Sequence, residues 1–454
     1  MVDRQSAVRT GLPPVAPKRA APVTNKENCG CRPVQLLREC EPMTSSPKLT
    51  RRKTVRLATA ALAGLATTSR RASAADTTGV TATEIKIGHT NPYSGPASSY
   101  SSSGKLEMAF FNQMVNDQGG VAGRKINFIS YDDQYSPPKT VEQVRRLIEE
   151  DKVAFLFNTL GTPTNSAIVR YVNQKKVPHL FVASGADKWG DYKEHPWTIG
   201  FQTSYRTEAQ IYAKYILAEK PDAKIGIIYQ NDDYGKDYPA GMKDVLGDNW
   251  DKYVVKAVTY EVTDPTIDSQ ITSLRAAGCD VLVTVAIPKF AVQTIRKVYD
   301  LGWKPMHILN SVAVSVGLVM EPVGPEKGVG IVSTGYLKDP TDPGFKDDAG
   351  MREWRDFMAK YLPGGDINDI TYVYAYSCCE TLMQVLKQCG DDFSRENIMR
   401  QATSLQDLEL PTLLPGIKIN TSPTNYRPMR ALQLMRWDGK TWARFGDVIE
   451  GMQA

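Results

Sequence analysis

Short apolar strand candidates alternate with segments of helical periodicity from residue 83 almost to the end of the chain. The strand candidates are rich in β-branched and apolar residues, and the segments between them repeat apolar residues at a spacing of three and four. This alternation predicts an α/β fold with parallel sheets and helices on both faces. The strand candidates are 85–88, 126–131, 153–157, 179–183, 225–229, 254–259, 281–285 and 306–309. The helical candidates are 104–117, 139–150, 164–174, 205–219, 236–247, 267–277, 289–301, 350–361 and 371–388.

Residues 85–135 form the clearest unit of this pattern: a strand, a Ser/Gly-rich loop, an amphipathic helix, a glycine turn, a second strand and an acidic loop. In open α/β sheets, ligands settle at the carboxyl ends of the strands, where loops lead into helices. The unit therefore predicts a small-molecule site, and this pattern fits a binding protein and an enzyme equally well.

About eight strand–helix units are more than a single sheet readily accommodates, so we expect two doubly wound α/β lobes. The chain is expected to cross between them near residue 201, at 328–336 and at 413–419. Lobe 1 would then hold 76–201 plus 335–416, and lobe 2 would hold 202–334 plus 417–454. The stretches 429–436 and 440–445 alternate like an antiparallel hairpin around Asp438-Gly439, a favoured turn dipeptide.

Positive charge is concentrated at the N-terminus. Residues 1–75 contain 14 Lys/Arg and 4 Asp/Glu, and the other 379 residues contain 41 and 46. The body is therefore mildly acidic, and we expect no nucleic-acid partner.

Residues 43–75 resemble a signal peptide: the basic stretch KLTRRKTVR, the apolar run LATAALAGLATT and an A-x-A motif ending at Ala74. The apolar run is shorter than the roughly 20 residues that span a bilayer. We expect export to the periplasm, by the general or the twin-arginine route, with cleavage near Ala74. Residues 1–42 are expected to be a non-native or disordered prefix.

The usual catalytic and metal-binding motifs do not occur in the sequence. Its four histidines lie outside H-E-x-x-H, its cysteines form no C-x-x-C, and G-x-S-x-G, the P-loop motif and G-x-G-x-x-G are all missing. The pairs Asp132-Asp133 and Asp232-Asp233 could act as acid and base, but loop or capping roles are commoner. We therefore expect no enzyme activity, no catalytic residues, no metal site and no cofactor.

Two loops carry polar groups where a strand ends and a helix or turn begins. Gly161-Thr162-Pro163-Thr164-Asn165 follows the strand 153–157, and Ala183-Ser184-Gly185 follows 179–183. Hydroxyls and free backbone N–H groups at a helix start suit a carboxylate. The alternative is that Thr164 or Ser184 only caps a helix. Tyr100 and Tyr234 would add aromatic faces from opposite lobes, unless they are ordinary surface residues.

In this order and spacing, several stretches resemble the periplasmic solute-binding proteins of the branched-chain amino acid type, which serve ABC importers. The resemblance covers residues 83–446. The matching stretches are IKIGHTNPYSGP followed by Tyr100, FFNQMVNDQGGVAGRKI, YDDQYSPPKTVEQVRRLI, NTLGTPTNSA, VPHLFVASGA, YQNDDYGKD and WDGKTW. The family fold has two α/β lobes joined by three crossings, the type I architecture, and traps its ligand by hinge closure.

By position, the resemblance implies ligand-binding roles for a set of residues in both lobes. Tyr100 should cover the ligand from lobe 1, Thr162 and Thr164 should bind its carboxylate, and Tyr234 should close from lobe 2. The full set is Tyr100, Thr162, Thr164, Ala183, Ser184, Gly185, Tyr234, Ile287, Asn310 and Ser311. The resemblance also implies a monomer that meets membrane permease subunits.

The sequence departs from the family in lobe 2. Amino-acid binders place an acidic residue after the strand that corresponds to 307–309, and this chain has Asn310-Ser311 there; it also has Ile287 where an aromatic residue is common. An ammonium group buried without a carboxylate is strongly disfavoured. The hypothesis is that the ligand keeps a carboxylate and lacks a free α-ammonium, as an aromatic or hydrophobic organic acid does. Asp232 or Asp233 could replace the missing acid, which leaves amino acids open.

The sequence is also compatible with two other functions. The same fold serves in receptor modules that sense amino acids or amides, and an enzyme on this fold would reveal itself by turnover of a bound ligand.

Overall fold

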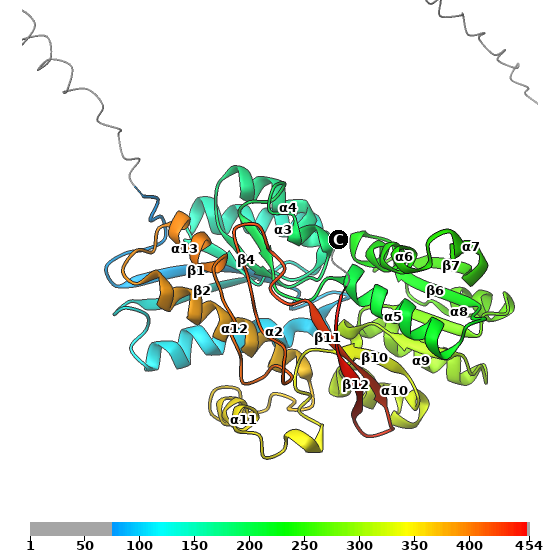
Figure 1. Cartoon of the computed structure of the whole chain (residues 1–454). Coiled ribbons are helices and arrows are strands. Elements are labelled where there is room, and N and C mark those ends of the chain that lie inside the picture. Colours follow the sequence, from blue (N-terminus) through cyan, green and yellow to red (C-terminus); the bar gives the residue numbers. More distant parts are fainter. Residues whose placement is uncertain (1–74, 452–454) are drawn as a thin grey trace, which may run out of the picture. The chain divides into compact units, whose positions relative to one another are not determined.

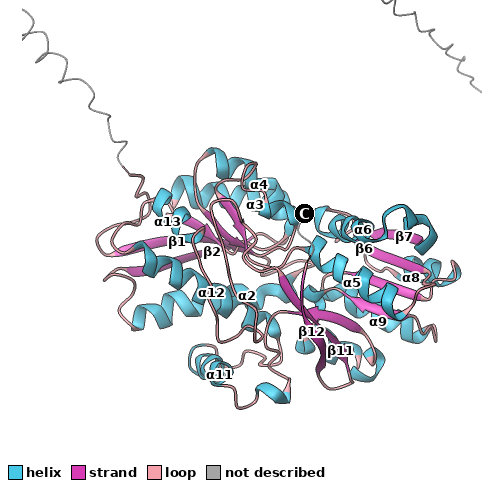
Figure 2. Ribbon diagram, in the orientation of Figure 1, coloured by secondary structure: helices cyan, strands magenta, loops and turns pink. Residues whose placement is uncertain are grey.

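The computed structural model describes residues 75–451, and the predicted prefix and signal peptide lie outside this range. Its strands form two sheets, as the alternating sequence pattern predicted (Figures 1 and 2). The first sheet contains β1 (Glu84–Asn91), β2 (Lys125–Asp132), β3 (Phe155–Phe157), β4 (His179–Val182) and β5 (Thr198–Gly200). The second contains β6 (Ile225–Gln230), β7 (Val254–Tyr260), β8 (Val281–Val285), β9 (Met306–Leu309), β10 (Val332–Gly335), β11 (Ala431–Trp437) and β12 (Trp442–Glu450).

Both sheets share one doubly wound topology. The first has the order β2-β1-β3-β4-β5 and is parallel throughout. The second begins with the equivalent order β7-β6-β8-β9-β10 and is extended by β11 and β12, which pair antiparallel. In such sheets the strand order reverses beside the first strand, and a crevice opens at that point. The fold class and the C-terminal hairpin are confirmed.

Helices cover both faces of the first sheet (Figures 1 and 2). On one face α2 packs against α12, and on the other α3 packs against α4. The apolar side chains of β1, Ile85 and Ile87, both belong to the cluster that contains residues of α2 and α12, and a separate apolar cluster lies among α3 and α4 on the other face. The bounds are α2 (Ser101–Ala109), α3 (Pro137–Arg145), α4 (Thr162–Gln174), α11 (Ala349–Tyr361), α12 (Ile370–Cys389) and α13 (Arg395–Ala402). Wider helical turns, η2 (Phe110–Val115) and η3 (Arg146–Glu150), continue α2 and α3.

The second sheet is covered in the same manner. Helix α5 packs against α6, and α8 packs against α9. Asp232 caps α6 by accepting a hydrogen bond from Gly235 N, which fixes where this helix starts. The bounds are α5 (Tyr205–Glu219), α6 (Asp233–Leu246), α7 (Trp250–Tyr253), α8 (Asp268–Ala276), α9 (Pro288–Asp300) and α10 (Glu321–Val323). Single turns are η1 (Ser98–Tyr100), η4 (Asp187–Gly190), η5 (Gly247–Asn249), η6 (Ser311–Ala313), η7 (Val316–Met320), η8 (Pro325–Gly328) and η9 (Pro343–Phe345).

Strand β10 lies within the second sheet, and the chain passes toward α11 only after it. The segment that leaves β10 pairs with the segment that precedes β11 through an antiparallel bridge between Leu337 and Leu413. Within residues 75–451, none of the helices combines the length and apolar character that a membrane span requires.

Candidate functional site

A pocket lies where the loops that follow the central strands of the two sheets meet. The loops after β1, β3, β6 and β8 reach it through Tyr100, Gly161, Tyr234 and Ile287. These are the positions at which a doubly wound sheet opens its crevice. The empty space is about 920 Å³, including the part open to solvent, which is room for a small organic molecule. The lining residues are Tyr100, Tyr135, Leu160, Gly161, Thr162, Ala183, Gln202, Tyr205, Tyr234, Ile287, Ser311, Val312, Val314, Thr334, Gly335, Tyr336, Leu337, Asp339, Ile370, Thr371, Tyr374 and Met435.

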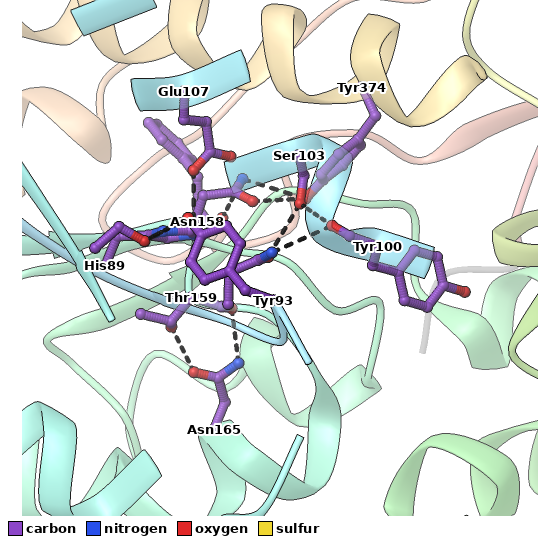
Figure 3. A network of polar contacts seen from close by, with 12 residues as sticks. His89, Tyr93, Tyr100, Ser103, Glu107, Asn158, Thr159, Asn165 and Tyr374 are labelled. Atoms are coloured by element: carbon purple, nitrogen blue, oxygen red, sulfur yellow. Dashed lines mark hydrogen bonds and ion pairs between the residues drawn. The ribbon is translucent and has the colours of Figure 1, made fainter. Parts of the chain in front are cut away.

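Tyr100 is held in place at both ends. Its backbone carbonyl accepts hydrogen bonds from Ser103 Oγ at 2.8 Å and from Asn91 Nδ2 at 3.2 Å (Figure 3). Its phenol donates to the carbonyl of Val312, which follows β9 of the second sheet, at 2.8 Å. The Tyr100 hydroxyl is therefore already used, and this residue offers its ring to the pocket.

The start of α4 is shaped by a second polar network (Figure 3). Asn165 Nδ2 donates to the carbonyls of Thr159 and Gly161, and Asn165 Oδ1 accepts from Thr159 Oγ1 at 2.6 Å. Gly161 has φ of +104°, and a Cβ there would lie 2.5 Å from the ring of Tyr135. No side chain caps the helix at this end. Gly161 N donates to the carbonyl of Ala183 at 3.1 Å, and Pro163 has no N–H. The N–H of Thr162, a lining residue, and the partial positive charge of the helix start are therefore what this turn offers to the pocket.

Counting protons shows that Thr162 presents a free hydroxyl donor. Ser184 Oγ accepts from Trp189 Nε1 at 2.8 Å and from Ala186 N at 3.2 Å, which uses both of its lone pairs. Its own hydrogen is then donated to Thr162 Oγ1, 2.6 Å away. The Thr162 hydrogen has no acceptor among the described residues, so it can be donated to a ligand.

Tyr234 provides a second donor from the other side of the pocket. Its hydroxyl accepts from Asn310 Nδ2 at 2.8 Å, and Asn310 Oδ1 in turn accepts from Ala286 N at 3.0 Å. The Tyr234 hydrogen therefore remains available. Thr162 and Tyr234 together suit a ligand atom that accepts hydrogen bonds, such as a carboxylate oxygen.

Ser311 is tied to a buried acid that lies behind the lining. Glu208 accepts from Ser311 N at 2.7 Å and from Ser311 Oγ at 2.8 Å, and from the hydroxyls of Tyr212 and Tyr238 at 2.6 and 2.9 Å. Burial raises the pKa of Glu208, and these hydrogen bonds oppose the rise. Because four donors already satisfy it, this carboxylate is not free for a ligand.

The ten residues predicted from the sequence divide between the lining and the layer beneath it. Six reach the pocket: Tyr100, Thr162, Ala183, Tyr234, Ile287 and Ser311. The other four are buried but do not line it: Thr164, Ser184, Gly185 and Asn310. Thr164 Oγ1 donates to the carbonyls of Leu160 and Gly161 and does not cap α4, whereas Ser184 and Asn310 hydrogen-bond to Thr162 and Tyr234.

The two acids considered as replacements are not part of the pocket lining. Asp232 accepts from Gln230 Nε2 at 2.6 Å in addition to capping α6. Asp233 forms an ion pair with Lys188, with Asp233 Oδ2 2.6 Å from the Lys188 Nζ. Neither lines the pocket.

Sequence reasoning missed Asp339, the only charged side chain of the lining. It is 7% exposed and follows β10, in the segment that leaves the second sheet. Its Oδ1 accepts from Thr341 N at 2.8 Å and from Thr341 Oγ1 at 2.6 Å. Its Oδ2 is buried and has no hydrogen-bond partner among the described residues. Burial raises the pKa of Asp339 to about 6. In the sequence, Asp339-Pro340-Thr341 has the composition of an ordinary turn.

Tyr135, Tyr205 and Tyr336 were missed as well. Tyr135 lies in the segment after β2, Tyr205 begins α5, and Tyr336 directly follows β10. Burial raises the pKa of each further above its usual value near 10, so all three stay neutral near pH 7. The pocket is therefore aromatic and largely uncharged apart from Asp339.

A buried His–Glu pair joins β1 to α2 (Figure 3). His89 Nε2 is 3.1 Å from Glu107 Oε2, and both side chains are fully buried. Burial lowers the pKa of His89 to about 3 and raises the pKa of Glu107. Burial therefore disfavours the charged form of both groups. Neither residue lines the pocket, and no group of three or more potential metal ligands occurs within residues 75–451.

Comparisons with known proteins agree with this architecture. A Leu/Ile/Val-binding protein homologue of Brucella suis is 24% identical over 378 residues, covering 80% of this chain and 92% of the relative. A branched-chain amino acid ABC transporter protein of Thermus thermophilus, solved with bound valine, has a TM-score of 0.72 at 14% identity and covers 81% of this chain and 97% of its own. A solute-binding protein of an ABC transporter from Rhodopseudomonas palustris, solved with benzoate, has a TM-score of 0.67 at 19% identity, with coverage of 81% and 97%.

The predicted family resemblance is confirmed by a match that runs from the first residue of β1 to the residue before β12. Residues 84–441 match the family described as periplasmic binding protein, and this range includes every residue of the pocket lining. The chain belongs to the periplasmic binding protein family.

Proposed function

We propose that this protein is the extracytoplasmic substrate-binding component of an ABC importer and captures a small carboxylate-bearing ligand between its two lobes. The family membership supports a binding role. The ligand would be an aromatic or hydrophobic organic acid or an amino acid. Valine and benzoate, the ligands of the two solved relatives, are different molecules, but both carry a carboxylate.

The observation that carries this proposal is the free donor set at the start of α4. Thr162 has a free hydroxyl hydrogen because Ser184 supplies its hydrogen bond, and the first turn of the helix is uncapped. A carboxylate placed here would gain charge-assisted hydrogen bonds and the favourable end of the helix dipole. Tyr234 donates from the opposite wall, so one ligand group could contact both lobes.

The remaining features of the proposal follow the family. Lobe 1 would hold 76–201 plus 335–416, lobe 2 would hold 202–334 plus 417–454, and three crossings would act as the hinge. The protein would work as a monomer in the periplasm, deliver its cargo to permease subunits, and bind without chemical turnover.

The test is to purify the mature protein, denature it and identify the released small molecules by mass spectrometry. Isothermal titration calorimetry with leucine, phenylalanine, benzoate and coumarate then measures affinity. A released or titrated carboxylate that binds with micromolar or tighter affinity and is recovered unchanged supports the proposal. A ligand that lacks a carboxylate, or one that is converted to a product, would contradict it.

A further inference from the structure

Asp339 has the features of a ligand-binding group and not of a structural one. It is nine-tenths buried, it lines the pocket, and it uses only one of its two oxygens within the protein. Buried carboxylates in folded proteins are normally paired or fully hydrogen-bonded, since an unsatisfied one destabilises the folded state. The unused Oδ2 therefore needs an explanation.

The charged side chains near this segment are paired with other groups and not with Asp339 Oδ2. Lys338, the neighbouring cation, donates to Asp348 Oδ2 at 2.8 Å and to the carbonyl of Pro411 at 2.7 Å. Arg444 bonds to Asp342 Oδ2 at 3.3 Å. The lining contains no Lys, Arg or His, so nothing within the pocket neutralises Asp339.

We propose that Asp339 binds a protonated amine of the ligand, and that the ligand is consequently an amino acid or another acid that also carries an ammonium group. This inference rests on the proposed function, because it assumes that the same pocket holds the carboxylate. An ammonium group offers three donors and a full positive charge, which match a carboxylate oxygen without a partner.

Asp339 revises the hypothesis drawn from Asn310-Ser311. The sequence places no acid after β9, which argued for a ligand without an ammonium group. The structure supplies an acid from a different element, the segment after β10. The pocket then offers hydrogen-bond donors at the start of α4 to the carboxylate of the ligand, and the carboxylate of Asp339 to its ammonium group.

The test compares matched ligand pairs that differ only in an ammonium group. The pairs are phenylalanine with 3-phenylpropanoate, leucine with 4-methylpentanoate, and 4-(aminomethyl)benzoate with 4-methylbenzoate. Affinities are measured by calorimetry at pH 7.5 for the mature wild type and for Asp339→Asn. Asn keeps Oδ1 as the acceptor for Thr341, so the loop retains its hydrogen bonds.

In at least one pair, the wild type should prefer the ammonium-bearing member about tenfold or more, since hydrogen bonds between charged groups are the stronger kind. Asp339→Asn should remove this preference and leave the affinity for the ammonium-free member within about threefold. Asp342→Asn is the matched control, because it removes a carboxylate from the same loop outside the lining. It should preserve the preference.

Two results would overturn the inference. In the first, the ammonium-free acid binds the wild type at least as tightly in every pair. In the second, Asp339→Asn weakens both members of a pair equally. Failure of every member to bind would contradict the proposed carboxylate site itself and the inference with it, so the two failures can be distinguished.

Discussion

At the scale of single residues, Thr162 lines the pocket with a hydroxyl hydrogen that has no acceptor among the described residues. Thr162→Val removes this donor and keeps the shape of the side chain. We expect the affinity for a carboxylate ligand to fall roughly 10- to 100-fold, the worth of a hydrogen bond to a charged group. Calorimetric titration of the variant measures the loss.

Thr164→Val is the matched control on the same turn of α4. Its hydroxyl donates only to backbone carbonyls and does not line the pocket. We expect this variant to lose about 1 kcal/mol of stability and to keep its affinity within a few-fold. Equal losses of affinity in both variants would show that the helix start matters and the Thr162 hydroxyl does not.

Asp339 should also leave a signature on the stability of the ligand-free protein. Burial raises its pKa from 3.8 to about 6, so folding favours the protonated form. This contribution is complete below pH 3.8 and is lost as the pH rises through about 6. Two pKa units correspond to roughly 3 kcal/mol. The Asn side chain of Asp339→Asn does not ionise and escapes this loss. The unfolding midpoint of Asp339→Asn relative to that of the wild type should therefore be a few °C higher at pH 7.5 than at pH 4.5.

Differential scanning calorimetry at the two pH values measures this gain. The lining tyrosines do not titrate in this range, because burial holds the pKa of each above 10. Asp342→Asn provides the reference for loss of a nearby charge. A wild type and Asp339→Asn with the same pH dependence would show that the Asp339 carboxylate is satisfied in solution.

At the scale of elements, the junction between β3 and α4 combines backbone strain with close packing. Gly161 has φ of +104°, and a Cβ there would lie 2.5 Å from Tyr135 Cε2 and 2.7 Å from Thr164 Oγ1. Gly161→Ala should displace both the Tyr135 ring and the start of the helix. We expect a loss of affinity of about 100-fold or more, because the N–H groups of α4 would no longer point as they do now. Titration calorimetry checks this.

Gly123→Ala separates the effect of the backbone conformation from the effect of close packing. Gly123 also has a positive φ, +75°, but a Cβ there has no neighbour within 4 Å. Gly123→Ala should lose about 1 kcal/mol of stability through its backbone conformation and keep ligand binding. Gly161 has ψ of 148°, a conformation nearly restricted to glycine at positive φ, so Gly161→Ala should lose more stability and also lose ligand binding. Unchanged affinity in Gly161→Ala would mean that Tyr135 can move without cost to the site.

The elements that could be predicted from the sequence are those with a local signal. Strand β1 and helix α4 follow from periodicity, and the loops at strand ends supplied Thr162 and Tyr234 as lining residues. Tyr135 and Asp339 could not be found in this way, because tertiary folding alone brings their connecting segments to the pocket. Ser184 and Asn310 were close in sequence to the true lining, but a one-residue spacing along a strand end does not reveal which side chain faces inward.

At the scale of the whole molecule, several contacts join elements that belong to different sheets. Tyr100, before α2, donates to Val312, after β9. Lys188 in η4 pairs with Asp233 of α6, and the N–H of Asp187 donates to Asp237 Oδ2 at 2.8 Å. Hinge proteins of this fold open and close by rotating one lobe against the other. Such contacts would then form on closure and stabilise the closed form.

Tyr100→Phe tests this coupling at the hydrogen bond to the Val312 carbonyl. The variant keeps the ring and leaves the Val312 carbonyl without its donor, which costs about 1–3 kcal/mol in the closed form. A ligand that binds the closed form must supply that difference, so its dissociation constant should rise by roughly 5- to 100-fold. Small-angle X-ray scattering should show a larger radius of gyration for the ligand-free variant than for the wild type.

Tyr426→Phe is the control that distinguishes an effect on lobe closure from the general effect of removing a tyrosine hydroxyl. Its hydroxyl also donates to a backbone carbonyl, that of Pro196 at 3.0 Å, but Tyr426 does not line the pocket. It should lower the unfolding midpoint and leave both affinity and radius of gyration unchanged. If the two variants behaved alike, Tyr100 would contribute stability only. If Tyr100→Phe alone opened the protein, the hydrogen bond to Val312 would be part of the closing mechanism, because the same bond type is lost in both variants and only its position differs.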